Sequence, residues 1–125
     1  MIVRDIRVAL KVGEIIGVEF SPPFTCLGIE KDGEIIGGAV FNVFEANDCH
    51  VSVAGTGFNR SFLAEVGHYV FTVLGKGRIT VITEQPRIVR IAERLGGKVE
   101  GLMRSHFGRS RDAYLVGILK EDYPW

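Results

Sequence analysis

The stretch CHVSVAGTGFNRSFLAEVGHYVFTVLGKGRITVIT, residues 49–83, decides the fold. Its first six residues alternate Val51 and Val53 with polar neighbours, as a half-buried strand does. After a glycine-containing turn, apolar residues recur at helical spacing, Asn59 can cap the start of that helix, and Gly75 suits its end. The β-branched run Arg78–Thr83 follows. Strand, helix and strand in this order predict two parallel strands joined by a crossover helix.

The residues before this unit predict one helix and one hairpin. From Asp5 to about Ile16, apolar residues fall on one helical face: Ile6, Ala9, Leu10 and Ile16. The segments Thr25–Lys31 and Glu34–Phe44 are rich in β-branched and aromatic residues. They are separated by Asp32-Gly33, a dipeptide that favours a tight turn, so they form a hairpin.

The residues after the unit predict a helix and a closing hairpin. Pro86 suits a first helical turn, and the apolar residues Ile88, Val89, Ala92 and Leu95 lead to Gly96-Gly97. Two strands, Lys98–Arg104 and Ala113–Lys120, follow with Ser105–Asp112 between them. The chain is therefore expected to be a single α/β domain, 1–125, with a mixed, mostly antiparallel central sheet and flanking helices.

Composition excludes several classes of protein. The chain has 15 lysines and arginines and 15 aspartates and glutamates. Its net charge is zero, so no overall electrostatic field favours nucleic acid or a membrane surface as partner. Residues 1–18 carry charges that rule out a signal peptide, and Cys26 and Cys49 lack metal-ligand spacing. Buried thiols in the cytoplasm, and no metal, are expected. No hydrolase, metalloprotease or P-loop motif occurs.

The last third of the chain resembles a known family. Residues 83–101, TEQPRIVRIAERLGGKVEG, are similar to the helix and "ERLGF..EG" signature of the Gcn5-related N-acetyltransferase superfamily. Residues 102–114, LMRSHFGRSRDAY, and the following VGIL at 116–119 are similar to the ending of its ribosomal-protein alanine acetyltransferase branch. The resemblance implies an acyl-CoA N-acyltransferase fold, acetyl-CoA as acyl donor, and a primary amine, either a protein N-terminus or a small amine, as acceptor.

Four departures from the family pattern stand out. The residues before Phe24 are too few for the usual first strand and two full helices. The turn after the first parallel strand keeps two glycines without the family's spacing. Ala92 stands where many relatives have a tyrosine acid, and Gln85 replaces an asparagine common just before the helix.

The turn Gly55–Ser61 is the best pyrophosphate site in the chain. Glycine lets backbone N–H groups approach a phosphate, a helix N-terminus adds partial positive charge, and Arg60 can add a charge-assisted bond. The alternative is that Gly55–Ser61 is only a strand-to-helix turn that binds no phosphate. By resemblance, the pantetheine arm lies in a gap between Val51–Ala54 and Val81–Thr83. The expected cofactor-binding residues are Val53, Ala54, Gly55, Thr56, Gly57, Phe58, Asn59, Arg60, Ser61 and Gln85.

Four side chains are candidates for catalysis. They are Tyr114 on the last strand, His50 and Ser52 on the strand beside the gap, and Glu84 after the next strand. Acyl transfer needs a base for the amine and an acid for the leaving thiolate. Two of them have a structural alternative. A tyrosine on a strand, such as Tyr114, is more often a core residue, and a lone histidine, such as His50, is more often a surface or hydrogen-bonded residue.

Two further groups of residues leave alternatives open. Arg104, His106, Arg109 and Arg111 either bind an acidic acceptor or the 3′-phosphate of CoA, or form a solvated rim. Tyr123 and Trp125 are candidates for an exposed homodimer contact. At the level of function, the alternative to an enzyme is an inactive domain that binds acyl-CoA or a protein partner.

Overall fold

One continuous sheet of seven strands organises the computed structural model, which describes residues 1–125. The strand order is β1-β2-β3-β4-β5-β7-β6. The strands are β1 (Ile2–Val3), β2 (Thr25–Lys31), β3 (Glu34–Glu45), β4 (Asp48–Gly55), β5 (Arg78–Thr83), β6 (Lys98–Gly108) and β7 (Arg111–Leu119). Neighbouring strands are antiparallel except β4 and β5, which are parallel. The predicted mixed sheet, its two hairpins and its one crossover are confirmed.

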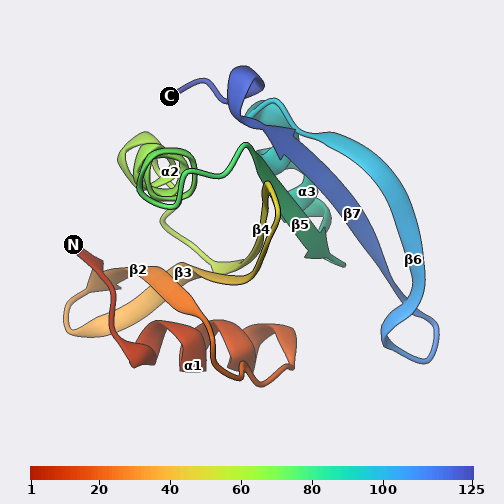
Figure 1. Ribbon diagram of the computed structural model, residues 1–125. Coiled ribbons are helices and arrows are strands. Elements are labelled where there is room, and N and C mark those ends of the chain that lie inside the picture. Colours follow the sequence, from red (N-terminus) through yellow and green to blue (C-terminus); the bar gives the residue numbers. More distant parts are fainter.

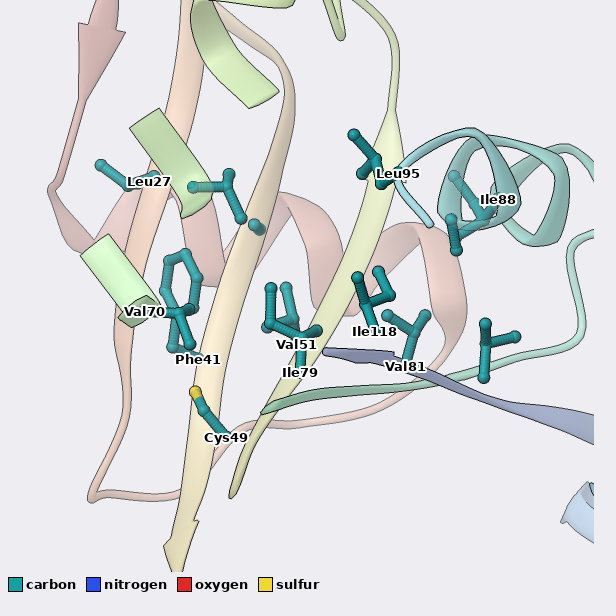
Figure 2. Packing of buried hydrophobic residues seen from close by; sticks show 14 of the residues in the cluster. Leu27, Phe41, Cys49, Val51, Val70, Ile79, Val81, Ile88, Leu95 and Ile118 are labelled. Atoms are coloured by element: carbon teal, nitrogen blue, oxygen red, sulfur yellow. The ribbon is translucent and has the colours of Figure 1, made fainter. Parts of the chain in front are cut away.

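Helices cover both faces of the sheet (Figure 1). Helix α1 (Ile6–Ile16) packs on one face of β2, β3 and β4, around a small apolar cluster that contains Val8, Val12 and Val40. On the opposite face lie α2 (Arg60–Gly67), the π-helix η1 (His68–Val73) and α3 (Pro86–Arg94). These helices enclose the larger core, which contains Phe41, Val51 and Ile118 (Figure 2). None of the helices combines the length and apolarity needed to cross a membrane.

Before β2 the chain forms the two-residue strand β1 and the single helix α1. The predicted apolar face of that helix is partly wrong. Ile6 and Leu10 are exposed, whereas Val8, Ala9, Val12 and Gly13 are buried. The helix turns this face to the sheet because Gly28 and Gly38 leave a hollow there. Val8 fills it so closely that a Cβ built on Gly28 would lie 2.3 Å from a Val8 methyl group.

The second helix begins as predicted but not as one α-helix. The Asn59 side chain accepts a hydrogen bond from the Phe62 N–H at 2.9 Å, which confirms the cap. The α-helical part ends at Gly67 and continues as η1, where the Leu74 N–H bonds the Tyr69 carbonyl five residues back. Gly67 sits against the ring of Tyr123, whose hydroxyl donates to the Leu63 carbonyl at 2.6 Å. Tyr123 is therefore a packed residue, and its prediction as an exposed contact is wrong.

The closing hairpin is longer than its sequence suggested. Strand β6 continues to Gly108 and β7 begins at Arg111, so most of the predicted connection Ser105–Asp112 is strand. The register of the hairpin is irregular between Met103 and Gly108, so this part of the strand lacks a regular alternation of apolar and polar residues. The Asp112 carboxylate, which accepts the Ser105 N–H at 2.8 Å, holds this irregular part in place.

Both cysteines are free and buried, which confirms that prediction. Burial, with a smaller effect of Asp48, raises the pKa of the Cys49 thiol to about 12. In the unfolded chain the same thiol ionises near pH 9. Above that pH the unfolded state therefore loses a proton that the folded state keeps, and stability falls as pH rises.

We expect Cys49 alone to lower the free energy of unfolding by up to about 1.4 kcal/mol per pH unit above pH 9. Urea titrations from pH 8 to 11 on the wild type and on Cys49→Ala test this. The variant should lose this part of the slope, while contributions from Cys26 and Tyr123, whose pKa values burial also raises, remain in both proteins. Parallel stability curves for the two proteins would contradict it.

Candidate functional site

The parallel strands β4 and β5 separate soon after they meet. Their paired residues end at His50 and Thr80, although β4 continues to Gly55 and β5 to Thr83 (Figure 1). Beyond this point β5 is paired only with β7, as far as Thr83 opposite Tyr114. The gap predicted between residues 51–54 and 81–83 is therefore present.

Two side chains bridge the gap. The Gln85 amide donates to the Val53 carbonyl at 3.1 Å, and the Arg87 guanidinium donates to the Gly55 carbonyl. In a strand, the N–H and C=O of one residue point to the same side, so the Val53 N–H also faces the gap. The bridges replace strand pairing at the point where backbone groups would otherwise have no partner.

The turn after β4 presents a set of free N–H donors. The Thr56 N–H is held by the Ile36 carbonyl at 2.9 Å and the Asn59 N–H by the Gly57 carbonyl at 2.8 Å. By contrast, the N–H groups of Gly57, Phe58, Arg60 and Ser61 donate to no protein group. Gly57 has a φ of +95°, a conformation that favours glycine. Free donors at a helix N-terminus make this turn suited to an anion.

A cavity of about 330 Å³ lies between this turn and α3. Three arginines line it: Arg60 from α2, and Arg87 and Arg94, two turns apart on α3. No carboxylate pairs with any of them. The cavity therefore holds a local positive charge in a chain whose net charge is zero. The sequence reasoning missed Arg87 and Arg94, although their seven-residue spacing on one helix was a usable signal.

A second, smaller cavity of about 90 Å³ opens on the gap from the face of α1. Its polar lining comes from Ser52, Glu84, Gln85 and Thr83, and its apolar lining includes Ile15, Ile16 and Phe107. The structure thus brings two predicted catalytic candidates, Ser52 and Glu84, to the same cavity. Phe107, from the long closing hairpin, was not anticipated because its strand was predicted to be a loop.

The other two candidates lie apart from this cavity. His50 sits where the β4–β5 pairing ends, with its Nε2 3.5 Å from the Asp48 carboxylate. Asp48 also accepts the Thr80 hydroxyl at 2.8 Å. Tyr114 pairs with Thr83, so it shares the sheet face of α3 and lies one strand from the gap, with 40% of its surface exposed. Ala92, at the tyrosine position of the family, is buried in the larger core.

The basic residues of the closing hairpin do not form one cluster. Arg111 forms an ion pair with Glu84, which raises the pKa of the Arg111 guanidinium. Arg104, His106 and Arg109 are exposed and have no acidic partner. No group of three or more His, Cys, Asp or Glu side chains is placed to hold a metal ion.

Two larger hollows, of about 520 and 510 Å³, flank α1 near Ile6 and Phe24. Their linings are mainly apolar and lie away from the gap. Neither contains the free donors of the turn after β4, so size alone does not identify the site.

Comparison with known proteins supports the fold. No family model matches the sequence, and no curated protein matches it. A mutant of spermidine N-acetyltransferase SpeG from Vibrio cholerae has a similar structure, with a TM-score of 0.68, 21% identity, and coverage of 83% of this chain and 69% of that one. Other mutant forms of spermidine/spermine N-acetyltransferase SpeG from Vibrio cholerae match with a TM-score of 0.73 and 17% identity, over 98% of this chain and 96% of that one. The expected N-acetyltransferase fold is thereby confirmed.

Proposed function

We propose that the protein binds acetyl-CoA and transfers its acetyl group to a primary amine. The observation that carries the proposal is the gap between β4 and β5, which has a turn with four free N–H groups at its end and a small polar cavity beside it. A long thioester with a phosphorylated end and a reactive end fits this arrangement. The shared fold with spermidine N-acetyltransferases supports the same reading.

In this proposal the phosphates lie at the turn. Gly55, Thr56, Gly57, Phe58, Asn59, Arg60 and Ser61 form it, and the free N–H groups of Gly57, Phe58, Arg60 and Ser61 donate to phosphate oxygens. Asn59 acts indirectly, because its side chain already caps α2. The pantetheine arm runs along Val53 and Ala54, where it takes over the bridge that Gln85 makes to the Val53 carbonyl. The Val53 N–H is then available to polarise the thioester carbonyl.

The chemistry is direct attack of a neutral amine on the thioester carbonyl. The nitrogen–carbon bond forms, the carbon–sulfur bond breaks, the amine loses a proton, and the thiolate of CoA gains one. Glu84 is the proposed base and Ser52 orients the amine, since both line the cavity on the face of α1. His50 is a second candidate base, two residues along the same strand. Tyr114, on the opposite face, is the candidate acid for the thiolate.

The finer identity of the acceptor is part of the proposal. The structural neighbours are named for spermidine, which makes spermidine the first amine to test. The resemblance of the C-terminal third to the ribosomal-protein alanine acetyltransferase branch makes a peptide N-terminus the second. The reaction as proposed needs no metal, and we place it in the cytoplasm.

A second function, acyl-CoA binding without turnover, is supported by two observations. The tyrosine position of the family is occupied by the buried Ala92, and the Glu84 carboxylate is engaged by Arg111. Isothermal titration with acetyl-CoA, followed by detection of free thiol in the presence of each amine, separates the two functions. An enzyme shows binding and amine-dependent thiol release, while a binding domain shows only the first. Absence of binding at millimolar acetyl-CoA would overturn both.

Glu84→Gln is expected to lower kcat about a hundredfold, because it removes the proposed base, and to leave acetyl-CoA affinity unchanged. Arg111→Gln is the matched control, since it breaks the same ion pair but keeps the carboxylate. Steady-state kinetics on both variants distinguish the roles. If the two variants lose activity equally, the role of Glu84 is to hold the closing hairpin in position through its ion pair with Arg111, and Glu84 is not the base.

A further inference from the structure

The residues after β7 return to the cavity beside α2 and α3. They run through a short 3₁₀ turn, η2 (Lys120–Asp122), back over the end of the sheet toward α2 (Figure 1). Trp125 is the only tryptophan of the chain, and it lines the same 330 Å³ cavity as the three arginines. It remains 44% exposed, so packing in the core does not account for its position.

The position of Trp125 is set by its neighbours. Tyr123, two residues earlier, is fixed by its hydrogen bond to Leu63 and by an edge contact with Phe71 at a centroid distance of 5.2 Å. Gly96, at the end of α3, approaches so closely that a Cβ there would lie 2.4 Å from the Asp122 carbonyl oxygen. Pro124 then restricts the backbone between Tyr123 and Trp125. The indole is thus presented to the cavity from an anchored segment.

The chemistry of the cavity is cationic and aromatic. The guanidinium carbon of Arg60 lies 5.4 Å from the centroid of the Trp125 ring, and that of Arg87 lies 5.8 Å from the centroid of Phe58. Neither arginine, nor Arg94, has a carboxylate partner. Unpaired guanidiniums select phosphates, and an exposed indole selects a flat ring. A ligand that carries both groups at one end matches this lining.

We propose that Trp125 is the surface on which the adenine ring of CoA stacks, next to the phosphates held by Arg60 and Arg94. This inference rests on the proposed binding of acetyl-CoA and adds a residue for its nucleotide end. An indole has two faces, so a base can stack on one while Arg60 stays against the other. Stacking of a base on an aromatic side chain is worth about 1–3 kcal/mol, which makes Trp125 a determinant of nucleotide affinity.

The test uses the intact protein and the fluorescence of its single tryptophan. Addition of CoA should change the emission of Trp125, and Trp125→Leu should weaken CoA binding about 5- to 150-fold by calorimetry. Trp125→Phe, which keeps a ring, should recover part of this loss. For 4′-phosphopantetheine, which has a phosphate but no adenine, the wild type and Trp125→Leu should bind equally.

Each outcome decides between the two proposals. If Trp125→Leu weakens CoA and 4′-phosphopantetheine alike, Trp125 only positions Arg60, and the stacking role is overturned. The same conclusion follows if the wild type binds CoA by calorimetry and Trp125→Leu binds it equally well. If the wild type binds no CoA at all, the proposed function itself fails, and the stacking role falls with it.

Discussion

Gly57→Asp should abolish acetyl-CoA binding at concentrations that saturate the wild type. Residue 57 lies in the turn where four N–H groups have no protein acceptor. A carboxylate there competes for those donors and repels the phosphates. Two like charges 4 Å apart near a protein surface repel by about 4 kcal/mol, so even a partly screened carboxylate should raise the Kd a hundredfold or more. Isothermal titration measures the change directly.

The matched control for this variant is Gly57→Asn. Asparagine and aspartate have nearly the same shape, and both accept positive φ angles better than other side chains with a Cβ. A Cβ at this position meets side-chain methyl groups of Ile29 and Ile36 at 3.1 to 3.3 Å, and this crowding is the same in both variants. Gly57→Asn should therefore bind acetyl-CoA far more tightly than Gly57→Asp. Equal affinities would show that the turn does not hold phosphate.

Gly28→Ala is expected to destabilise the fold by about 3 kcal/mol, the upper end of the usual cost of overpacking a core. The added methyl would lie 2.3 Å from one methyl of Val8 and 3.1 Å from the other. Val8 is fully buried and cannot move away without lifting α1 from the sheet. Urea unfolding of the wild type and the variant gives the difference.

A double-mutant cycle identifies the cause. Val8→Ala removes the methyl groups that the new side chain would strike, so Gly28→Ala should cost much less in that background. The coupling between the two substitutions should be stabilising and exceed about 1 kcal/mol. If the two losses of unfolding free energy simply add, the close approach of Val8 to Gly28 is not the reason that a larger side chain at residue 28 destabilises the fold.

Local sequence signals predicted most of the fold because each depends on a few adjacent residues. Asp32-Gly33 marked a hairpin, and Asn59 and Pro86 marked helix starts, all of which the structure contains. The failures depend on contacts between distant segments. The burial of Tyr123 follows from its fit against Gly67, and the buried face of α1 follows from the hollow at Gly28 and Gly38. Neither fit is visible in a local pattern.

The candidate site divides in the same way. The order of strands, together with the family resemblance, predicted the glycine turn, the gap and the candidates Ser52 and Glu84. Arg87 and Arg94 could be predicted as site residues only if it were known that α3 faces the turn. Trp125 could be predicted only if it were known that the segment after β7 returns to this cavity. Gln85 was expected near the cofactor, but its bridge to Val53 joins two residues that are 32 apart in sequence, so no local pattern predicts it.

The separation of β4 from β5 also gives the protein two sheet edges in its interior. Free edges accept additional extended chains, and proteins usually protect them with side chains or cover them. Here Gln85 and Arg87 occupy the carbonyl groups of one edge. A pantetheine arm, with its two amides, can replace these side chains as a short extra strand would, in the manner of β-augmentation. The strength of the hydrogen bonds from Gln85 and Arg87 therefore sets how readily an extended ligand replaces these side chains at the interior edge.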